Sequence, residues 1–179
     1  MKKFWGIMLL AVSLIFIIHG TIHAQNSSRA KPVTYRDLML GNISYGDSVG
    51  SISRKLNEAP KVEKVSNVIT YDFSCIHVTE FTHTDRKSDW QMLVLGNSRL
   101  QTPRGIHVNS SLNDVVNVYG HTPYKMDFKD EVLYAYPVSN ANGSLGIEFF
   151  VNYSSNLITV IRIHSINLDF YKRYPSNRR

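Results

Sequence analysis

Five histidines follow the first 24 residues, and they are the side chains that could bind a metal ion. None is spaced from another as His-x-His or His-x-x-x-His, and no acid-rich helix accompanies any of them. His77 and His83 could share one face of a strand, but six residues of extended chain separate them by about 20 Å. We therefore expect no metal site and no cofactor. The five are His77, His83, His107, His121 and His164.

Cys75 is the only cysteine, so it could act as a nucleophile but cannot form a disulfide within the chain. Cys75 and His77 point the same way on a strand, yet such neighbours lie about 6.6 Å apart, which is too far for a catalytic dyad. The sequence contains no Gly-x-Ser-x-Gly elbow, phosphate-binding loop or dinucleotide fingerprint. We expect a protein that is not an enzyme, with a hydrolase as the third alternative. For Cys75 we expect a small buried apolar role, with pairing to another chain as the alternative.

Binding residues are better supported than catalytic ones. Along residues 145–152, the alternation of apolar side chains predicts a strand with Glu148 and Phe150 on its outward face. Along residues 157–164, the same alternation turns Arg162 and His164 outward. An aromatic side chain among polar neighbours is typical of a protein-binding surface. The alternative is that Phe150 packs against the other half of the chain.

An internal repeat organises the chain. When the sequence is shifted by 63 residues, residues 43–73 align without a gap with residues 106–136. Other aligned positions keep only their apolar character, including Val49 with Leu112 and Ile52 with Val115. The pairs that are identical in the two copies are Ile43/Ile106, Ser48/Ser111, Pro60/Pro123 and Tyr71/Tyr134.

Each copy opens with the apolar spacing of a short amphipathic helix, predicted over Ser48–Leu56 and Ser111–Tyr119. In each copy a serine or aspartate stands at the position of an N-cap, and Asp114 completes a weak capping box with Ser111. Pro60 and Pro123 prevent either helix from continuing.

Runs of β-forming residues separated by turn residues follow each helix. Strands joined by short turns are antiparallel. We expect strands over residues 68–73, 76–82 and 90–95 in the first copy, and over 132–136, 145–152 and 157–164 in the second.

The predicted fold class is therefore α+β, with two tandem copies of a short helix (or helix pair) packed on a three-stranded antiparallel meander. Each helix should cover one face of its sheet and leave the other open. Residues 25–34 look unstructured, and Tyr35–Leu40 could add a short helix. The predicted segments are a lead-in over residues 25–40, a first repeat over 41–102, a second repeat over 103–167 and a basic tail over 168–179.

The first 24 residues have the features of a signal peptide. Lys2 and Lys3 precede a predominantly apolar run from Phe4 to Ile18, and Ala24 is the small residue that a cleavage site requires. The run is shorter than the 20 or so residues of a membrane-spanning helix. We expect cleavage after Ala24 and a secreted or periplasmic protein, with an uncleaved anchor as the alternative.

The formal charge of +6 does not mark a nucleic-acid binder. Residues 25–171 hold 14 basic and 14 acidic side chains, so the body of the protein is neutral. The excess of positive charge lies in Lys2, Lys3 and the last eight residues. The C-terminal tail could be a disordered solubilising end, or it could contact anionic lipid or cell-wall polymer.

The repeat motif, Ile-x-x-Gly-x-Ser-x-x-x-Val-x-x-x-(Leu/Tyr)-Gly-x-x-Pro before a tyrosine-bearing strand and a hairpin, resembles that of the β-lactamase-inhibitor-protein-like (BLIP-like) superfamily. That superfamily includes the small lipoprotein of the outer-membrane β-barrel assembly machinery. The first copy departs from the motif at Gly50 and Asn57. The resemblance implies a non-catalytic protein-binding scaffold of the bacterial cell envelope, with a cell-wall or anionic-polymer binder as the alternative. The matching residues of the second copy are Ile106, Ser111, Val115, Tyr119, Gly120 and Pro123.

Overall fold

The computed structural model describes residues 31–81, 89–94, 100–138 and 145–173, with the backbone alone described over 89–94. The predicted signal peptide, with its predicted cleavage site at Ala24, lies outside these residues, as do residues 25–30, His83 and residues 174–179.

The described chain contains both helices and strands, which confirms the α+β class. Its helical segments are η1 (Tyr35–Asp37), α2 (Val49–Leu56), α3 (Leu112–Tyr119) and α4 (Leu168–Arg173). Its strands are β1 (Met39–Leu40), β2 (Ile43–Ser44), β3 (Lys61–Val65), β4 (Val68–Asp72), β5 (Ile76–Phe81), β6 (Asp89–Val94), β7 (Lys125–Asp127), β8 (Glu131–Pro137), β9 (Gly146–Asn152) and β10 (Ile158–His164).

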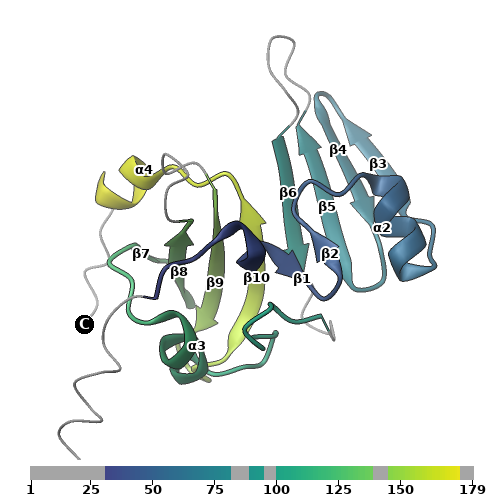
Figure 1. Ribbon diagram of the computed structural model, residues 1–179. Helices are drawn as coiled ribbons and strands as arrows, with labels where there is room; N and C mark the ends of the chain where they lie inside the picture. Colours follow the sequence, from purple (N-terminus) through teal and green to yellow (C-terminus); the bar gives the residue numbers. More distant parts are fainter. Residues whose placement is uncertain (1–30, 82–88, 95–99, 139–144, 174–179) are drawn as a thin grey trace, which may run out of the picture.

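Eight of the strands form one antiparallel sheet in the order β3-β4-β5-β6-β10-β9-β8-β7 (Figure 1). The last strand of each half of the chain joins the sheet at its centre, where Arg162 pairs with Leu93 and Ile163 with Met92. The order of a helix followed by four strands therefore occurs twice, once on each side of the β6–β10 pair.

Both expected helices are present, and each begins directly after its expected N-cap residue. Ser48 and Ser111 are the N-caps of α2 and α3, and the side chain of each accepts a hydrogen bond from the backbone three residues later. Asp114 closes the capping box with Ser111. Asn57 ends α2 in the left-handed conformation, at φ 52°.

Each half contributes four strands to the eight-stranded sheet, so the prediction of three was one strand short. The strands of this sheet that were missed are β3 and β7, and the separate pair β1–β2 was not predicted either. All five residues of β3 are exposed, and β7 has only three residues. Neither strand therefore carries the apolar alternation by which a half-buried strand is recognised.

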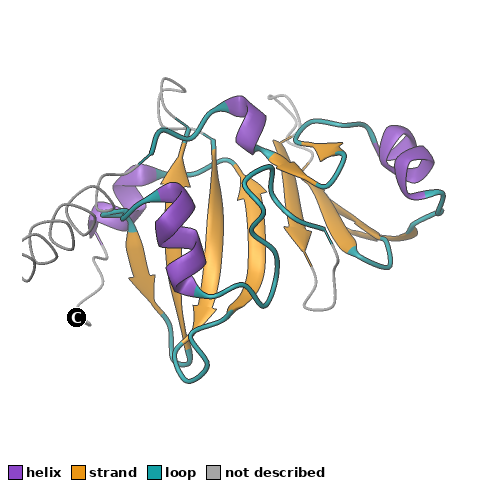
Figure 2. Cartoon of the chain, turned by 60° about the horizontal axis from the view of Figure 1, so that its bottom comes forward, coloured by secondary structure: helices purple, strands orange, loops and turns teal. Residues whose placement is uncertain are grey.

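The main core lies between the sheet and the elements on one of its faces, which we call the helix face. In the second half, Val115 and Tyr119 of α3 pack there against buried side chains of β8, β9 and β10. Tyr119 lies 5.3 Å, between ring centroids, from both Tyr136 and Phe149. Figure 2 shows α3 in front of these strands.

The described part of the lead-in is packed against the sheet, contrary to the prediction of an unstructured segment. Val33 is buried and forms a parallel bridge with Val138. Tyr35–Asp37 form a single 3-10 turn in place of the longer helix expected over Tyr35–Leu40. This short segment is ordered by contacts with residues far away in the sequence, such as Val138.

The beginning of the predicted basic tail is helical. Helix α4 buries Tyr171 against Leu133, Ala135 and Ile166, on the sheet face opposite α3. The expectation of an open sheet face is therefore wrong for the second half of the chain.

Candidate functional site

The structure brings together all four residues that the sequence singled out for binding. Glu148 and Phe150 lie on β9, Arg162 and His164 lie on β10, and the two strands are neighbours in the sheet. Arg162 is the register partner of Glu148. Alternation along both strands turns these side chains away from the helix face, as expected.

Glu148 is completely buried, which corrects its prediction as a surface residue. Arg162 Nε donates a hydrogen bond to its Oε2 at 2.6 Å, and the hydroxyl of Tyr171 donates to its Oε1. His164 Nε2 lies 2.8 Å from Oε2, although the ring is not aligned for a hydrogen bond. Helix α4, which supplies Tyr171, excludes water from the carboxylate.

The contacts around Glu148 keep it ionised. Burial raises the pKa of the carboxyl, but His164, Arg162 and Tyr171 together outweigh burial and hold the pKa below its ordinary value. The pKa of Tyr171 is raised, first by burial and then by the adjacent negative charge. Tyr171 therefore stays protonated and acts as a hydrogen-bond donor.

Phe150 is half-buried and is held by aromatic and cationic neighbours of its own half. Its ring stacks on Phe128 at 5.9 Å between centroids, and the guanidinium carbon of Arg162 lies 4.9 Å from the ring centroid. It packs with the cluster around Leu133 and Tyr171. The described contacts of Phe150 thus all come from its own half of the chain.

Three of the four predicted residues border a pocket of about 260 Å³ between α4 and the sheet. Glu148, Arg162 and His164 line it, together with Met126 and Leu133. Phe128 and Phe170 also line it and remain 44% and 48% exposed. We call this feature the α4 pocket; apolar and polar side chains share its walls, and hydrogen bonds hold Glu148, Arg162 and Tyr171 together.

A second polar cluster, formed by Asp37 and Arg104, was not predicted from the sequence. Arg104 donates to both carboxylate oxygens of the buried Asp37, through Nε at 2.6 Å and Nη2 at 2.8 Å. It also donates to the backbone oxygens of Pro32 and Val118, and its guanidinium lies 4.5 Å from the ring centroid of Tyr119. No sequence signal links residues 67 positions apart, so only the fold reveals this contact.

This second cluster holds the lead-in against the end of α3 and does not resemble a reaction centre. Burial raises the pKa of Asp37, but Arg104 and the backbone and side chain of Thr34 hold it below its ordinary value. Burial raises the pKa of Tyr119 to about 12. All three groups thus stay in their ordinary protonation states at neutral pH.

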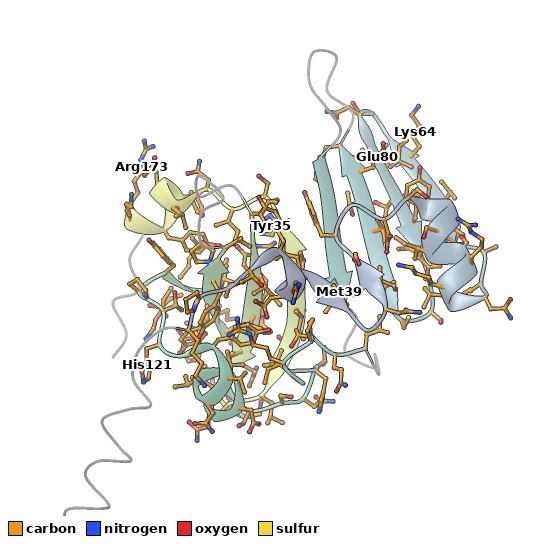
Figure 3. The ribbon with its side chains drawn as sticks, in the orientation of Figure 1. Tyr35, Met39, Lys64, Glu80, His121 and Arg173 are labelled. Carbon is orange, nitrogen blue, oxygen red and sulfur yellow. The ribbon has the colours of Figure 1, made fainter. Side chains whose placement is uncertain are left out.

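Cys75 is half-buried, and burial followed by the charge of Glu58 raises the pKa of its thiol. A raised thiol pKa disfavours the reactive thiolate. His77 pairs through Nδ1 with Asp72 on the neighbouring strand. Of the remaining histidines, His107 Nδ1 contacts the backbone oxygen of Val108, and His121 is exposed beyond α3 (Figure 3).

Within the described ranges, no group of three histidine, cysteine, aspartate or glutamate side chains is arranged to hold a metal ion. The same residues include no helix of sufficient length and apolarity to cross a membrane.

Comparison with known proteins gives no further guide to this site. No protein-family model matches the chain, and neither a curated protein nor a solved structure matches it.

Proposed function

We propose that this protein is an exported, non-catalytic scaffold of the bacterial cell envelope that binds a protein partner at the α4 pocket. The observation that carries the proposal is the pairing of a preformed pocket with two exposed phenylalanines, Phe128 and Phe170. Binding energy at protein interfaces is concentrated in aromatic anchors and in arginine, with polar groups around them. Arg162, which is stacked on Phe150, supplies the fixed polar component.

The size of the pocket favours a side chain of a protein over a free small molecule. Sites for drug-sized ligands measure about 300–1,000 Å³, and the α4 pocket measures about 260 Å³. One apolar side chain of a partner would occupy it, while Phe128 and Phe170 contact the surrounding backbone.

The two halves of the chain are, in this proposal, copies of one unit related to the BLIP-like superfamily. The order of a helix and four strands in both halves supports it, as do the serine N-caps Ser48 and Ser111. Two copies would build a sheet wide enough to present a binding face beside the pocket.

Export supports the envelope assignment through the signal-peptide features of residues 1–24. Expression of the full chain in a bacterial host with N-terminal sequencing of the product tests it. We expect the mature protein to begin at Gln25, and an intact N-terminus on a cytoplasmic product would contradict export.

The binding proposal is tested with the partner that the wild-type protein recovers from an envelope fraction. Once that partner is purified, Phe128→Ala and Phe170→Ala should each weaken binding about 30-fold, equivalent to about 2 kcal/mol for an aromatic anchor. Tyr35→Ala removes a more exposed aromatic ring from η1 that does not line the pocket, and it should leave the affinity unchanged. Equal affinities for all four proteins would reject the α4 pocket as the binding site.

The second candidate is an anionic-polymer or lipid binder that uses the basic C-terminal end. Lys172 and Arg173 are exposed at the end of α4, where Figure 3 labels Arg173. Deletion of residues 174–179 together with Lys172→Ala should then abolish salt-sensitive sedimentation with wall material. A hydrolase, the third candidate, requires an activity that Cys75→Ala removes.

A further inference from the structure

β3 is the outer strand at one end of the sheet. It pairs with β4 on one side, and no described strand lies along its other side (Figure 1). All five of its residues are exposed, and its two valines, Val62 and Val65, are 57% and 63% exposed. A strand edge of this kind is a template for pairing with another chain.

The two ends of the sheet differ in how well they are covered. β8, the second strand from the far end, has four buried residues, whereas β4, which holds the equivalent place, has none. The far edge ends in the three-residue β7, and α4 covers the adjacent strands. The apolar residues of β3 and β4 are thus less covered than their counterparts.

The backbone of β3 has free hydrogen-bonding groups at alternate residues. Val65 pairs with Val68 across a two-residue turn, so this pair is hydrogen-bonded within the hairpin. Alternation along an antiparallel ladder then points the N–H and C=O of Lys61, Glu63 and Val65 toward β4. The same groups of Val62 and Lys64 point outward.

We propose that a second copy of this chain covers the edge, by antiparallel pairing of β3 with β3 about a two-fold axis beside Val62. Opposite residues of an antiparallel pair lie on the same sheet face, so a symmetric pairing must centre on one residue. The choice of the central residue decides which charged side chains of the two copies face each other.

Charge complementarity favours Val62 over the charged residues of β3 as the centre. In that register Val62 faces Val62, and Lys61 of each copy faces Glu63 of the other. Centring on Glu63 would oppose two carboxylates, and centring on Lys64 would oppose two ammonium groups. Val62 is also a residue whose backbone groups point outward, so the central pair can exchange both hydrogen bonds.

The same register extends a row of polar side chains across the sheet. His77 is the register partner of Asp72, and Asp72 is the register partner of Lys61. Across the dimer, Glu63 of the second copy would stand next in the row. Figure 3 shows Lys64 at this outer end of the molecule.

Sedimentation equilibrium of the mature chain across the micromolar range tests the proposal through a charge exchange. Lys61→Glu turns two attractive pairs into two repulsive ones and should weaken the dimer about tenfold or more. Glu63→Lys should do the same, and the double variant Lys61→Glu/Glu63→Lys should restore wild-type association. A monomer at every concentration, or a double variant as weak as the single variants, would overturn the proposal.

Cross-linking in a Cys75→Ala background tests the register itself. Two Val62→Cys chains would meet with Cα atoms about 5.5 Å apart, within the range of a disulfide, so mild oxidation should give a covalent dimer. Val65→Cys is equally exposed, but in this register it faces Ala59 of the other copy and should give little dimer. Faster cross-linking through Val65→Cys than through Val62→Cys would overturn the register.

Discussion

At the scale of single residues, Glu148 shows how a buried carboxylate is stabilised. Removing such a group from water costs several kcal/mol unless charges and donors replace the water. Arg162 and Tyr171 supply them from β10 and α4, and the ring of His164 lies beside the carboxylate. One residue thus ties the C-terminal helix to the centre of the sheet.

Replacing Glu148 by Gln should lower the free energy of unfolding by about 2 kcal/mol at neutral pH, because Arg162 loses its charged partner. The folded pKa of Glu148 lies below its ordinary value of 4.5. The stabilising effect is therefore present above that value and is lost as pH falls through the folded pKa. Urea unfolding of both proteins over a pH series should show the difference shrinking as the pH falls below 4.5.

Tyr171→Phe separates the hydrogen bond from the packing of the ring and should cost less than Glu148→Gln. A difference between wild type and Glu148→Gln that stays constant down to low pH would contradict this account of the Glu148 cluster.

At the scale of elements, α2 and α3 depend on their ends. Each has eight residues, and helices this short are not stable alone in water. Their formation rests on N-caps and on an apolar stripe packed against the rest of the protein. In α3 that stripe includes the fully buried Val115 and Tyr119.

Ser111→Ala removes the N-cap of α3 and should lower the free energy of unfolding by about 1 kcal/mol. Asn113→Ala changes an exposed residue of the same helix that has no capping role, and it should be neutral or slightly stabilising. Thermal unfolding of the two variants side by side makes the comparison, and equal effects would show that capping is unimportant here.

At the scale of the whole molecule, the sheet is continuous but its two ends are unequally packed. Residues of β8 and β9 are buried by α3 on one face and by α4 on the other. β3 is exposed throughout, and β4 is only half-buried.

Amide hydrogen exchange should therefore follow the order of the sheet. We expect β3 and β4 to exchange first and β8, β9 and β10 last, because local opening is easiest where few apolar contacts are lost. Exchange measured by mass spectrometry at low protein concentration tests this for the monomer. Uniform protection across the sheet would contradict it.

Arg104 joins its own segment to two other parts of the chain, the lead-in and the end of α3. It binds Pro32 and Asp37 in the lead-in and Val118 in α3. Lysine cannot reproduce its planar fork of donors, so Arg104→Lys should cost about 2 kcal/mol. Limited trypsin digestion should then cut faster at Arg36. Arg54→Lys, on the exposed side of α2, is the matched control and should behave as wild type.

Local signals in the sequence were sufficient for the elements with strong patterns. The apolar spacing and serine caps of α2 and α3 are local features, and so is the alternation along β9 and β10 that turns Phe150 and Arg162 the same way. These predictions succeed because each depends on contacts within a few residues or on one face of one element.

Only the tertiary structure decided which of those faces is covered. Helix α4 formed from a segment with the composition of a basic tail, since its main anchor, Tyr171, has its partner Glu148 on a strand 23 residues earlier. Asp37 and Arg104 are separated by 67 residues and show no common pattern. Composition and periodicity describe what a residue can do beside its neighbours, whereas burial and pairing between distant residues arise only when the chain has folded.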